Sequence, residues 1–573
     1  MQKTFQLSTL LSHQVKKYGK RAALYYRDAL SKKWLPVSWN ELCQKVETLA
    51  GALIQSNVKS EEKVGIFAPN MPEAIMADFA NYAVHAVSVP MYATSTKSQI
   101  EFIVDDSEIG VIFAGEQYQY DIACKVLETS KTLHTVVAMS PSVDLRGIKG
   151  GISWKDYLEQ GEMHPNTEII SQRRAMSSQE DLVNILYTSG TTGQPKGVML
   201  HQSNYTEIMR THNEILSMLN DKDTSMCFLP LTHVFERAWS CLCLATGCTL
   251  AINQHPAEIL RSMKEIHPTC MCAVPRFWEK VYAGVQEKIE SSSPIQRKLL
   301  LDALKVGKEY NVDYKMRGLV PPVALKMQYL FYEKTVIALL LKNLGLENHN
   351  FFPTAGATIP PVVEEFIHSA GIMMLAGYGL TESTATVSCD RWNEKISIGS
   401  VGKVLDGVQV KFAENNEILL KGDTITKGYY RKAEVTELSI DEEGWFHTGD
   451  AGYMKDGELY LTDRIKDLFK TSNGKYISPQ LIESKLCVDK YIDQIVVVAE
   501  QRKFVSALVI PQYDLLKELA RDYGVDCTTN EELCANERVV KFMMYRIETL
   551  QQEFAHYEQI KKITLLPQPF SLD

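Results

Sequence analysis

The segment from Tyr187 to Val198 has the composition of a polyphosphate-binding loop. It reads YTSGTTGQPKGV and contains three glycines, four small hydroxyl side chains and one lysine. Glycine lets backbone N–H groups approach an anion closely, and hydroxyls and lysine add donors and positive charge. No window matches G-x-x-x-x-G-K-[ST], so a loop that opens a helix is not expected. The flanking apolar runs predict a loop between two strands, and the alternative is a flexible loop without a ligand.

A second cluster, Gly377–Ser383, reads GYGLTES. An aromatic ring between glycines can expose its face to a flat base. Thr381 beside Glu382 offers a phosphate donor next to a hard oxygen ligand for magnesium. Upstream, the small residues of Thr354–Ala357 would let a base lie against the backbone. Taken alone, this cluster also fits a turn at a strand end with a buried tyrosine.

Two further clusters are polar. Gly444–Asp450 reads GWFHTGD, and the carboxylate of Asp450 could accept hydrogen bonds from two adjacent sugar hydroxyls. Asp463–Asp467 reads DRIKD, and four charged residues around one isoleucine do not form a core strand. We therefore expect this segment on the surface or in a hinge. Each cluster taken singly also fits a solvated turn.

Length and composition restrict the class of protein. A chain of 573 residues implies two or more domains, and 45% hydrophobic and 23% charged residues are typical of a globular protein. The net charge of −9 argues against a general nucleic-acid binder. We expect no membrane span, because no apolar run of about 18 residues occurs. We expect no signal peptide, because the start of the chain has only a short apolar stretch before His13, followed by basic residues. Twelve cysteines without zinc-finger spacing predict reduced thiols in a cytoplasmic protein.

Strands and helices are expected to alternate in the first half of the chain, which is typical of parallel sheets covered by helices. The predicted strands are 64–68, 86–90 and 110–114, and the predicted helices are 72–84 and 97–104. Ser203 is predicted to cap a helix that ends near Leu216.

The second half is less regular. A charged, mostly helical insertion is expected at about 273–344, with a break at Pro321-Pro322. A β-hairpin is predicted around Asn415-Asn416. Beyond Asp463 we expect a second, small α/β unit, in which Ser478 caps a helix and Pro479 occupies its first turn.

In this order, the four clusters resemble the AMP-forming acyl-CoA synthetase family, over nearly the whole chain from about Ser8. The segments 229–237 (LPLTHVFER) and 274–282 (VPRFWEKVY), with the helical insertion after them, are most similar to long-chain fatty acid–CoA ligases. The resemblance implies an α/β fold. It implies a large N-terminal domain of stacked α/β sheets with a small β-barrel-like subdomain (1–463), and a small mobile C-terminal α/β domain (464–573).

The same resemblance implies a role for each motif residue. The ATP phosphates would be held by Thr188, Ser189, Gly190, Thr191, Thr192, Gly193 and Lys196. The adenosine would lie among Tyr378, which stacks on the base, Gly356, Ala357, Gly379, Asp450 at the ribose and Arg464 beside it. Thr381 would contact the α-phosphate, and magnesium would be held by Glu382 and Thr191.

The remaining implied roles concern the acid and the second half-reaction. His233 would lie beside the acyl carboxylate, with Trp239 and Gly377 at the acyl chain. Lys466 would be the hinge of the small domain, and the segment with Gly474 and Lys475 would swing toward the active site. The apolar tract 238–245 suits a fatty tail, and ~16 carbons contribute on the order of 10 kcal/mol before ordering costs.

The implied reaction has two steps. Fatty acid and ATP, with Mg²⁺, give acyl-AMP and pyrophosphate, and coenzyme A then takes the acyl group and releases AMP. We expect no nucleic-acid partner; peripheral membrane contact and a homodimer are both compatible with the sequence. The alternatives are an acyl-AMP ligase that delivers to a carrier protein, and a non-catalytic protein that binds a nucleotide or acyl-adenylate.

The C-terminus departs from the family pattern. Relatives carry a lysine in a Pro/Gly/Lys-rich segment near the end, whereas this sequence stops at LLPQPFSLD, and Lys561 and Lys562 fall too early to replace it. We expect that the last segment is missing from this sequence. The alternative is a form that is impaired in the first half-reaction.

Overall fold

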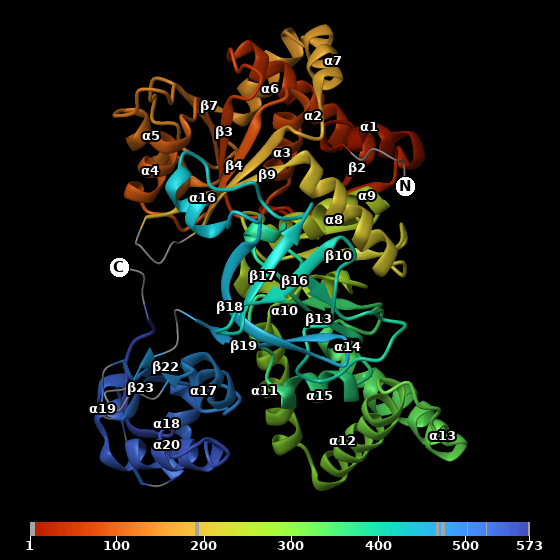
Figure 1. The fold of residues 1–573 in the computed structure, drawn as a ribbon, viewed down its shortest axis with the longest axis vertical. Helices are drawn as coiled ribbons and strands as arrows, with labels where there is room; N and C mark the ends of the chain where they lie inside the picture. Colours follow the sequence, from red (N-terminus) through yellow and green to blue (C-terminus); the bar gives the residue numbers. More distant parts are fainter. Residues whose placement is uncertain are drawn as a thin grey trace.

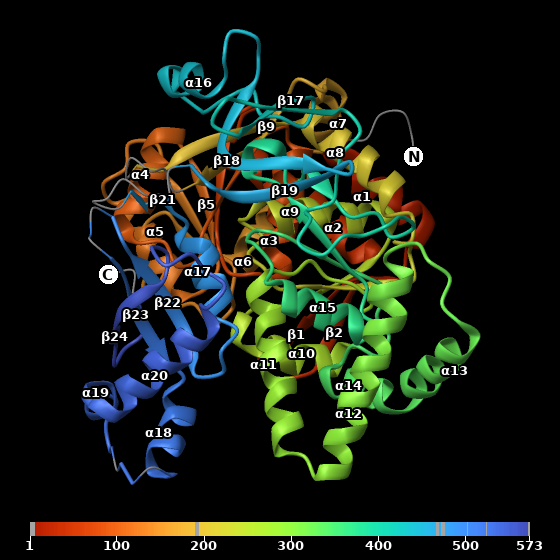
Figure 2. The same cartoon turned by 60° about the horizontal axis from the view of Figure 1, so that its bottom comes forward.

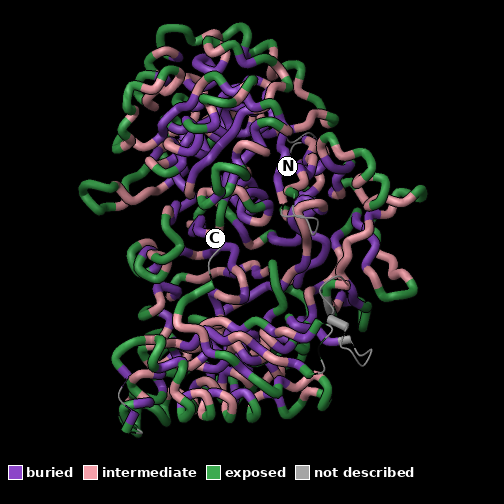
Figure 3. The backbone as a smooth tube through the Cα atoms, turned by 90° about the vertical axis from the view of Figure 1, so that its left-hand side faces the viewer, coloured by how far each residue is buried: buried purple, intermediate pink, exposed green. Residues whose placement is uncertain are grey.

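The computed structural model describes residues 6–188, 194–465, 469–470, 476–500, 502, 504–522, 524–525 and 527–570. A large N-terminal body carries a small C-terminal domain at one end (Figure 1). Buried backbone runs through the interior, and exposed loops and helix ends lie outside it (Figure 3). This division agrees with the predicted fold class.

In the described part of the chain, the largest sheet has seven strands in the order β7-β6-β5-β3-β4-β8-β9. It is parallel except for the antiparallel pair β8–β9. Its strands are β3 (Lys63–Phe67), β4 (Val87–Met91), β5 (Val111–Ala114), β6 (Thr135–Ala138), β7 (Gly151–Ser153), β8 (Leu182–Thr188) and β9 (Lys196–His201). Its helices include α2 (Trp39–Gln55), α3 (Pro72–Ala83), α4 (Lys97–Ser107), α5 (Gln117–Leu127), α6 (Trp154–Met163) and α7 (Thr167–Met176). The predicted strands and helix starts are confirmed to within about one residue.

A second sheet runs β10-β11-β1-β2, and single bridges through Cys270 connect it to the sheet β12-β13-β14-β15. The strands are β1 (Ala22–Arg27), β2 (Trp34–Ser38), β10 (Thr224–Cys227), β11 (Thr249–Ile252), β12 (Phe352–Thr354), β13 (Met374–Tyr378), β14 (Ser388–Cys389) and β15 (Lys403–Val404). The helices beside them are α1 (Leu7–Tyr18), α8 (Gln202–Ile215), α9 (Val234–Thr246), α10 (Ile259–Ile266) and α15 (Pro361–Ser369), with 3-10 turns at Pro256–Glu258 and Thr381–Ser383.

The cap of α8 was predicted at the wrong residue. The helix begins at Gln202, and its N-cap is His201, whose backbone N–H donates to Asn204 Oδ1 at 2.7 Å. Ser203 lies inside the first turn instead of preceding it. The strand β9 runs directly into the helix, so the asparagine three residues after the cap satisfies the free backbone donor.

An antiparallel sheet runs β16 (Val408–Phe412), β17 (Glu417–Gly422), β18 (Phe446–Lys455) and β19 (Glu458–Arg464). The strand β15 lies against both β16 and β19, which gives this subdomain its barrel-like form. The hairpin between β16 and β17 turns at Asn415-Asn416, as predicted. Helix α16 (Ala433–Ser439) lies in the connection between β17 and β18.

The predicted helical insertion is a group of helices that projects from the large domain (Figures 1 and 2). It comprises α11 (Pro275–Ser291), α12 (Pro294–Gly307), a π-helical turn (Lys308–Lys315), α13 (Val323–Tyr332), a second π-helical turn (Glu333–Ile337) and α14 (Ala338–Leu344). Pro321-Pro322 separate the first π-helical turn from α13, because proline cannot continue a helix.

The C-terminal domain has its own core around a sheet in the order β22-β23-β24. Its elements are β20 (Phe469–Lys470), β21 (Tyr476–Ile477), α17 (Pro479–Leu486), β22 (Ile492–Val498), β23 (Val505–Pro511), α18 (Tyr513–Asp522), α19 (Asn530–Ala535), α20 (Glu537–Leu550) and β24 (Ile560–Leu565). Ser478 caps α17 as predicted, since its Oγ accepts from Leu481 N at 3.3 Å. The domain rests against α11 through ion pairs of Arg276 with Asp493 and of Lys490 with Glu290.

Candidate active site

A cleft of about 890 Å³ opens where β8, β9, β18 and the turn after β13 meet. It gathers predicted site residues from segments that are far apart in the chain. These are Thr188, Lys196, His233, Gly356, Gly379, Thr381, Glu382, Asp450 and Arg464. The predicted residues Ser189, Gly190, Thr191, Thr192, Gly193, Lys466, Gly474 and Lys475 lie outside the described residues.

The Gly- and Thr-rich segment connects two paired strands, as predicted. Thr188 at the end of β8 lies opposite Lys196 at the start of β9. The Lys196 ammonium lies 5.4 Å from the ring centre of Tyr429, in a cation–π contact. The strand pair therefore places a hydroxyl and a cation side by side at the mouth of the cleft.

Glu382 lies in the 3-10 turn after β13, and its carboxylate is held by one neighbour. Tyr429 donates its hydroxyl to Glu382 Oε1 at 2.8 Å. Burial raises the pKa of Glu382, although the hydrogen bond from Tyr429 and the charge of Lys196 oppose this shift. One carboxylate oxygen has a protein partner, which leaves acceptor capacity on the group for a ligand.

Asp450 sits between an aromatic hydroxyl and a guanidinium. Tyr378 donates its hydroxyl to Asp450 Oδ2 at 2.7 Å, and Arg464 Nε lies 3.2 Å from Oδ1. The register of β18 and β19 places Asp450 directly opposite Arg464. Burial and the neighbouring carboxylate raise the pKa of Tyr378 far above its usual range, so the tyrosine stays a neutral donor.

Gly379 links Tyr378 to the acidic turn, and its lack of a side chain is required there. A Cβ at this position would lie 1.9 Å from the carbonyl oxygen of Ala385. Any other residue would collide with the backbone of Ala385 and Thr386 and displace the turn that carries Thr381 and Glu382.

His233 is the N-cap of α9 and faces the cleft. Its Nδ1 accepts from Phe235 N at 3.2 Å, and desolvation lowers its pKa, which favours the neutral ring. The preceding loop is held by Asn70, which accepts from Leu231 N at 2.9 Å and donates to Leu229 O at 2.7 Å. Buried contacts of this kind fix the position of a neutral imidazole at the wall of the cleft.

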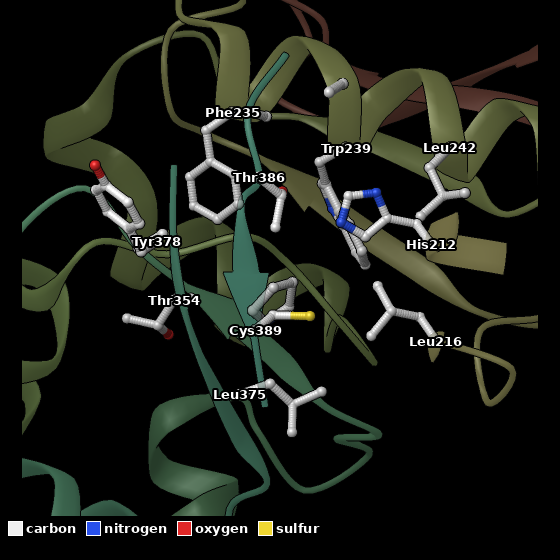
Figure 4. Close-up of a pocket in the computed structure, with 15 residues that line it drawn as sticks. His212, Leu216, Phe235, Trp239, Leu242, Thr354, Leu375, Tyr378, Thr386 and Cys389 are labelled. Atoms are coloured by element: carbon white, nitrogen blue, oxygen red, sulfur yellow. The ribbon is translucent and has the colours of Figure 1, made fainter. Parts of the chain in front are cut away.

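A small apolar pocket of about 40 Å³ lies next to the cleft (Figure 4). Tyr378 is at one end of it, and His212, Leu216 and Leu242 are at the other. The predicted acyl residues Trp239 and Gly377 line this pocket, whereas Ala357 is exposed and lines neither cavity. Trp239 is held by its Nε1, which donates to Ser225 Oγ at 2.8 Å.

Among the site residues that the sequence did not predict are Tyr429 and His212. Tyr429 holds Glu382, and His212 lines the apolar pocket with its Nδ1 3.0 Å from Ile208 O. Burial lowers the pKa of His212 to about 4, so its ring is neutral. Neither residue stands in a motif, and both reach the site through packing between distant segments, so one sequence offers no pattern for them.

The described residues include no group of three or more His, Cys, Asp or Glu side chains arranged to hold a metal ion. Magnesium keeps several waters and often binds one or two carboxylates together with substrate phosphates. Glu382 at the edge of the cleft fits that pattern. Among the described helices, none is long and apolar enough to cross a membrane.

Comparison with protein families finds a match to the AMP-binding enzyme model over residues 11–430. Long-chain-fatty-acid–CoA ligase 5 of Rattus norvegicus is 30% identical to this chain over 570 residues, which cover 94% of the chain and 80% of the relative. Long chain acyl-CoA synthetase 4 of Arabidopsis thaliana is 28% identical and covers 98% of the chain and 86% of the relative.

Solved structures share the fold. The adenylation domain of a carboxylate reductase from Mycobacterium chelonae superposes with a TM-score of 0.78 at 19% identity, covering all of this chain and 87% of that one. The anthranilate CoA ligase AuaEII, solved with anthranoyl-AMP, gives a TM-score of 0.74 at 16% identity over 99% of this chain and 94% of that one. O-succinylbenzoate coenzyme A synthetase from Bacillus subtilis, solved with ATP and magnesium, gives 0.65 at 18% identity over 98% and 96%.

Proposed function

The chain belongs to the AMP-binding enzyme family, and from this we propose that it is a long-chain fatty acid–CoA ligase that works through an acyl-AMP. The relatives named for long-chain acids match it over nearly its whole length. The observation that carries the proposal is the cleft of 890 Å³, in which hydroxyls, a lysine and carboxylates from separate segments meet beside an apolar pocket.

In the first step, a carboxylate oxygen of the fatty acid attacks the α-phosphorus of ATP. The bond to the bridging oxygen breaks, pyrophosphate leaves, and a mixed anhydride forms. Catalysis of this displacement depends mainly on positioning and on neutralisation of phosphate charge. Lys196 and Thr188 are proposed at the β- and γ-phosphates together with the loop 189–193. Thr381 is proposed at the α-phosphate.

The nucleoside is proposed to lie along β18 and the turn after β13. The carboxylate of Asp450 would accept from the ribose hydroxyls, and the ion pair with Arg464 orients this group. The base is proposed against Gly356 and the ring of Tyr378. Because Tyr378 already donates to Asp450, its position is fixed before a nucleotide binds.

Magnesium, when bound with ATP, would supply positive charge to the phosphates, and Glu382 is the residue proposed to hold it. Replacing Glu382 by glutamine keeps the bond from Tyr429 and removes the charge. We expect the variant to need about tenfold more magnesium for half-maximal ATP binding, as measured by calorimetry. An unchanged magnesium titration would exclude Glu382 as the ligand, and Glu414→Gln, at an exposed carboxylate that does not line the cleft, is the matched control.

In the second step, the thiolate sulfur of coenzyme A attacks the acyl carbon, and AMP leaves with the electron pair of the broken C–O bond. We propose that the C-terminal domain turns about Lys466 between the two steps and brings Gly474 and Lys475 to the cleft. His233, neutral at the wall of the cleft, is proposed to orient the acyl carboxylate.

Product analysis with ATP, palmitate and coenzyme A tests the proposal. We expect acyl-CoA, AMP and pyrophosphate in equal amounts. Acyl-AMP that accumulates in the presence of coenzyme A would favour delivery to a carrier protein. Nucleotide binding without release of pyrophosphate would favour a non-catalytic binding protein.

The proposed location is the cytoplasm, in contact with a membrane surface where long-chain acids collect. All twelve cysteines are free thiols, which is usual in a reducing compartment.

A further inference from the structure

The helix α13 has apolar side chains on both of its faces. Its ten residues, VALKMQYLFY, include two polar ones, Lys326 and Gln328. The inner face is buried: Leu325 and Tyr329 pack into the core, and Tyr329 stacks on Tyr310 with ring centres 4.2 Å apart. A helix that is apolar all round is normally enclosed on all sides.

The outer face of α13 is open to solvent. We define the α13 surface as Leu319, Val320, Val323, Met327 and Phe331, whose exposed fractions run from 54% to 88%. Val323, Met327 and Phe331 follow one another at intervals of four, so they form one stripe along the helix. Both views of the fold place α13 at the outer edge of the molecule, on the side away from the C-terminal domain (Figures 1 and 2).

Two exposed lysines lie beside this surface. Lys326 and Lys334 stand three residues from Val323 and Phe331 respectively. In the part of the chain that the structure describes, neither of the two has an ion-pair partner. The chain as a whole carries a net charge of −9, so this basic rim is a local exception.

We propose that the α13 surface docks the protein on a membrane that contains anionic lipids. Exposed aliphatic and aromatic side chains with a rim of lysines are typical of helices that lie in the membrane interface. Lysine stems extend over apolar surface while their ammonium groups reach phosphate headgroups. Each lysine near an anionic surface strengthens binding by about fivefold.

A second copy of this chain fits the surface less well. A symmetric dimer would bring the same patch of both copies together and place the lysine rim of one against that of the other. Protein interfaces are also depleted in lysine and enriched in Trp, Tyr and Arg. This inference rests on the proposed function. A membrane contact would bring the enzyme to its substrate, because a long-chain acid is concentrated in the bilayer.

Co-sedimentation with vesicles tests the inference on the full chain. We expect binding to phosphatidylcholine vesicles that contain phosphatidylglycerol, weaker binding to pure phosphatidylcholine, and loss of most binding at high salt. The triple variant Val323→Ser, Met327→Gln, Phe331→Gln should bind at least tenfold more weakly. Lys326→Glu with Lys334→Glu should remove the preference for anionic vesicles.

The matched control is Leu30→Ser with Met163→Gln, which changes side chains that are 93% and 70% exposed elsewhere on the molecule. The control should bind vesicles like the unchanged protein. All variants are assayed for acyl-CoA formation with octanoate, a water-soluble acid, so that misfolding is detected. If the unchanged protein binds vesicles but makes no acyl-CoA, the proposed function is wrong and the inference that the α13 surface binds membranes still holds.

Two results would overturn the membrane surface. One is equal vesicle binding by the triple variant and the unchanged protein. The other is a dimer in light scattering that the triple variant dissociates, since the occupant would then be a second copy.

Discussion

At the scale of single residues, the described partners that orient Asp450 include two of different kinds, Arg464 and Tyr378. Arg464 supplies charge at 3.2 Å, and Tyr378 supplies a neutral donor at 2.7 Å from a ring that also lines the apolar pocket. The carboxylate therefore keeps one geometry in the absence of a nucleotide. A hydrogen bond to a charged group contributes about 1.5–3 kcal/mol.

Tyr378→Phe removes this donor and keeps the ring. We expect the KM for ATP to rise about tenfold, because Asp450 loses the contact that orients it toward the ribose, with little change in the KM for the acid. Steady-state kinetics with each substrate varied in turn measures the effect. Tyr453→Phe, on an exposed tyrosine of β18, the strand that carries Asp450, is the control. An unchanged KM for ATP would show that the hydroxyl of Tyr378 does not contribute to nucleotide binding.

Glu364 is a buried carboxyl that makes stability depend on pH. Its Oε2 accepts from Gly399 N at 2.9 Å, and its Oε1 has no partner. Burial raises its pKa from 4.5 to about 7, and the nearby charge of Glu458 acts in the same direction. The folded state thus holds a proton that the unfolded state releases above pH 4.5, so this group makes folding less favourable as the pH rises to 7.

Glu364→Gln should remove this dependence. We expect the variant to gain about 2 kcal/mol of stability relative to the unchanged protein between pH 5 and pH 8, at 1.36 kcal/mol per pKa unit. Urea unfolding at the two pH values measures the gain. The exposed Glu414→Gln is the control. An equal effect of Glu364→Gln at both pH values would mean that this carboxyl does not titrate in the range.

At the scale of elements, α8 and α9 form one wall of the apolar pocket. His212 and Leu216 come from α8 and the residue that follows it, and Phe235, Ala238 and Trp239 come from α9. The volume of 40 Å³ is far below the roughly 300 Å³ of a typical ligand site. A long acyl tail therefore requires these side chains to move.

His212→Ala would enlarge the pocket at the end opposite Tyr378. We expect the ratio of kcat/KM for longer over shorter acids to rise about fourfold per added methylene that the new space accepts, from about 0.8 kcal/mol per methylene. A profile of acids from C8 to C20 measures the shift. His164→Ala, on an exposed histidine, is the control. An unchanged profile would place the tail elsewhere.

Many strands could be predicted from the sequence because both faces of their sheet are covered, so that each strand is a continuous apolar run. The run Val111–Ala114 is apolar throughout and fully buried, and its strand was predicted to within one residue. The start of α8 was wrong because the N-cap is His201, whose backbone N–H donates to Asn204 Oδ1, and Ser203 lies inside the first turn. Strand order is not contained in local patterns: β8 pairs with β4 through Ser88 and Asn184, which are 96 residues apart.

The candidate site also has a part that could be predicted from the sequence and a part that could not. Residues in compact motifs, such as Glu382 and Asp450, were predicted one by one, and the structure brings them to one cleft. The contacts that hold the motif residues in place were not predicted. Tyr429, which stands in no motif, contacts Glu382 from 47 residues away, and Tyr378 contacts Asp450 from 72 residues away. Both contacts depend on the packing of segments that are distant in the chain.

At the scale of the whole molecule, the described contacts between the C-terminal domain and the large domain include two ion pairs and the packing of Val488 against the large-domain core. Arg276 Nη2 lies 2.9 Å from Asp493 Oδ1, and Lys490 pairs with Glu290. All four side chains are partly exposed, and such pairs contribute about 0–1 kcal/mol each. Ion pairs of this strength favour the observed position of the C-terminal domain but are weak enough for the domain to adopt a different position.

Arg276→Ala with Lys490→Ala should loosen this arrangement. We expect the population with the small domain undocked to rise about fivefold at low salt, which small-angle scattering would record as a larger radius of gyration. Arg21→Ala, which breaks an ion pair to Asp221 within the large domain, is the control. An identical scattering profile for the double variant would show that apolar contacts hold the two domains instead.

The helix α9 reaches from one cavity to the other: His233 caps it at the cleft, and Leu242, nine residues on, lines the far end of the apolar pocket. A helix of this length moves as a rigid rod. If a long acyl tail displaces α9, the displacement also moves the imidazole of His233 at the N-terminus of the helix. Short acids that do not contact α9 would then bind but turn over slowly. Selectivity for chain length would therefore be expressed in kcat more than in binding affinity.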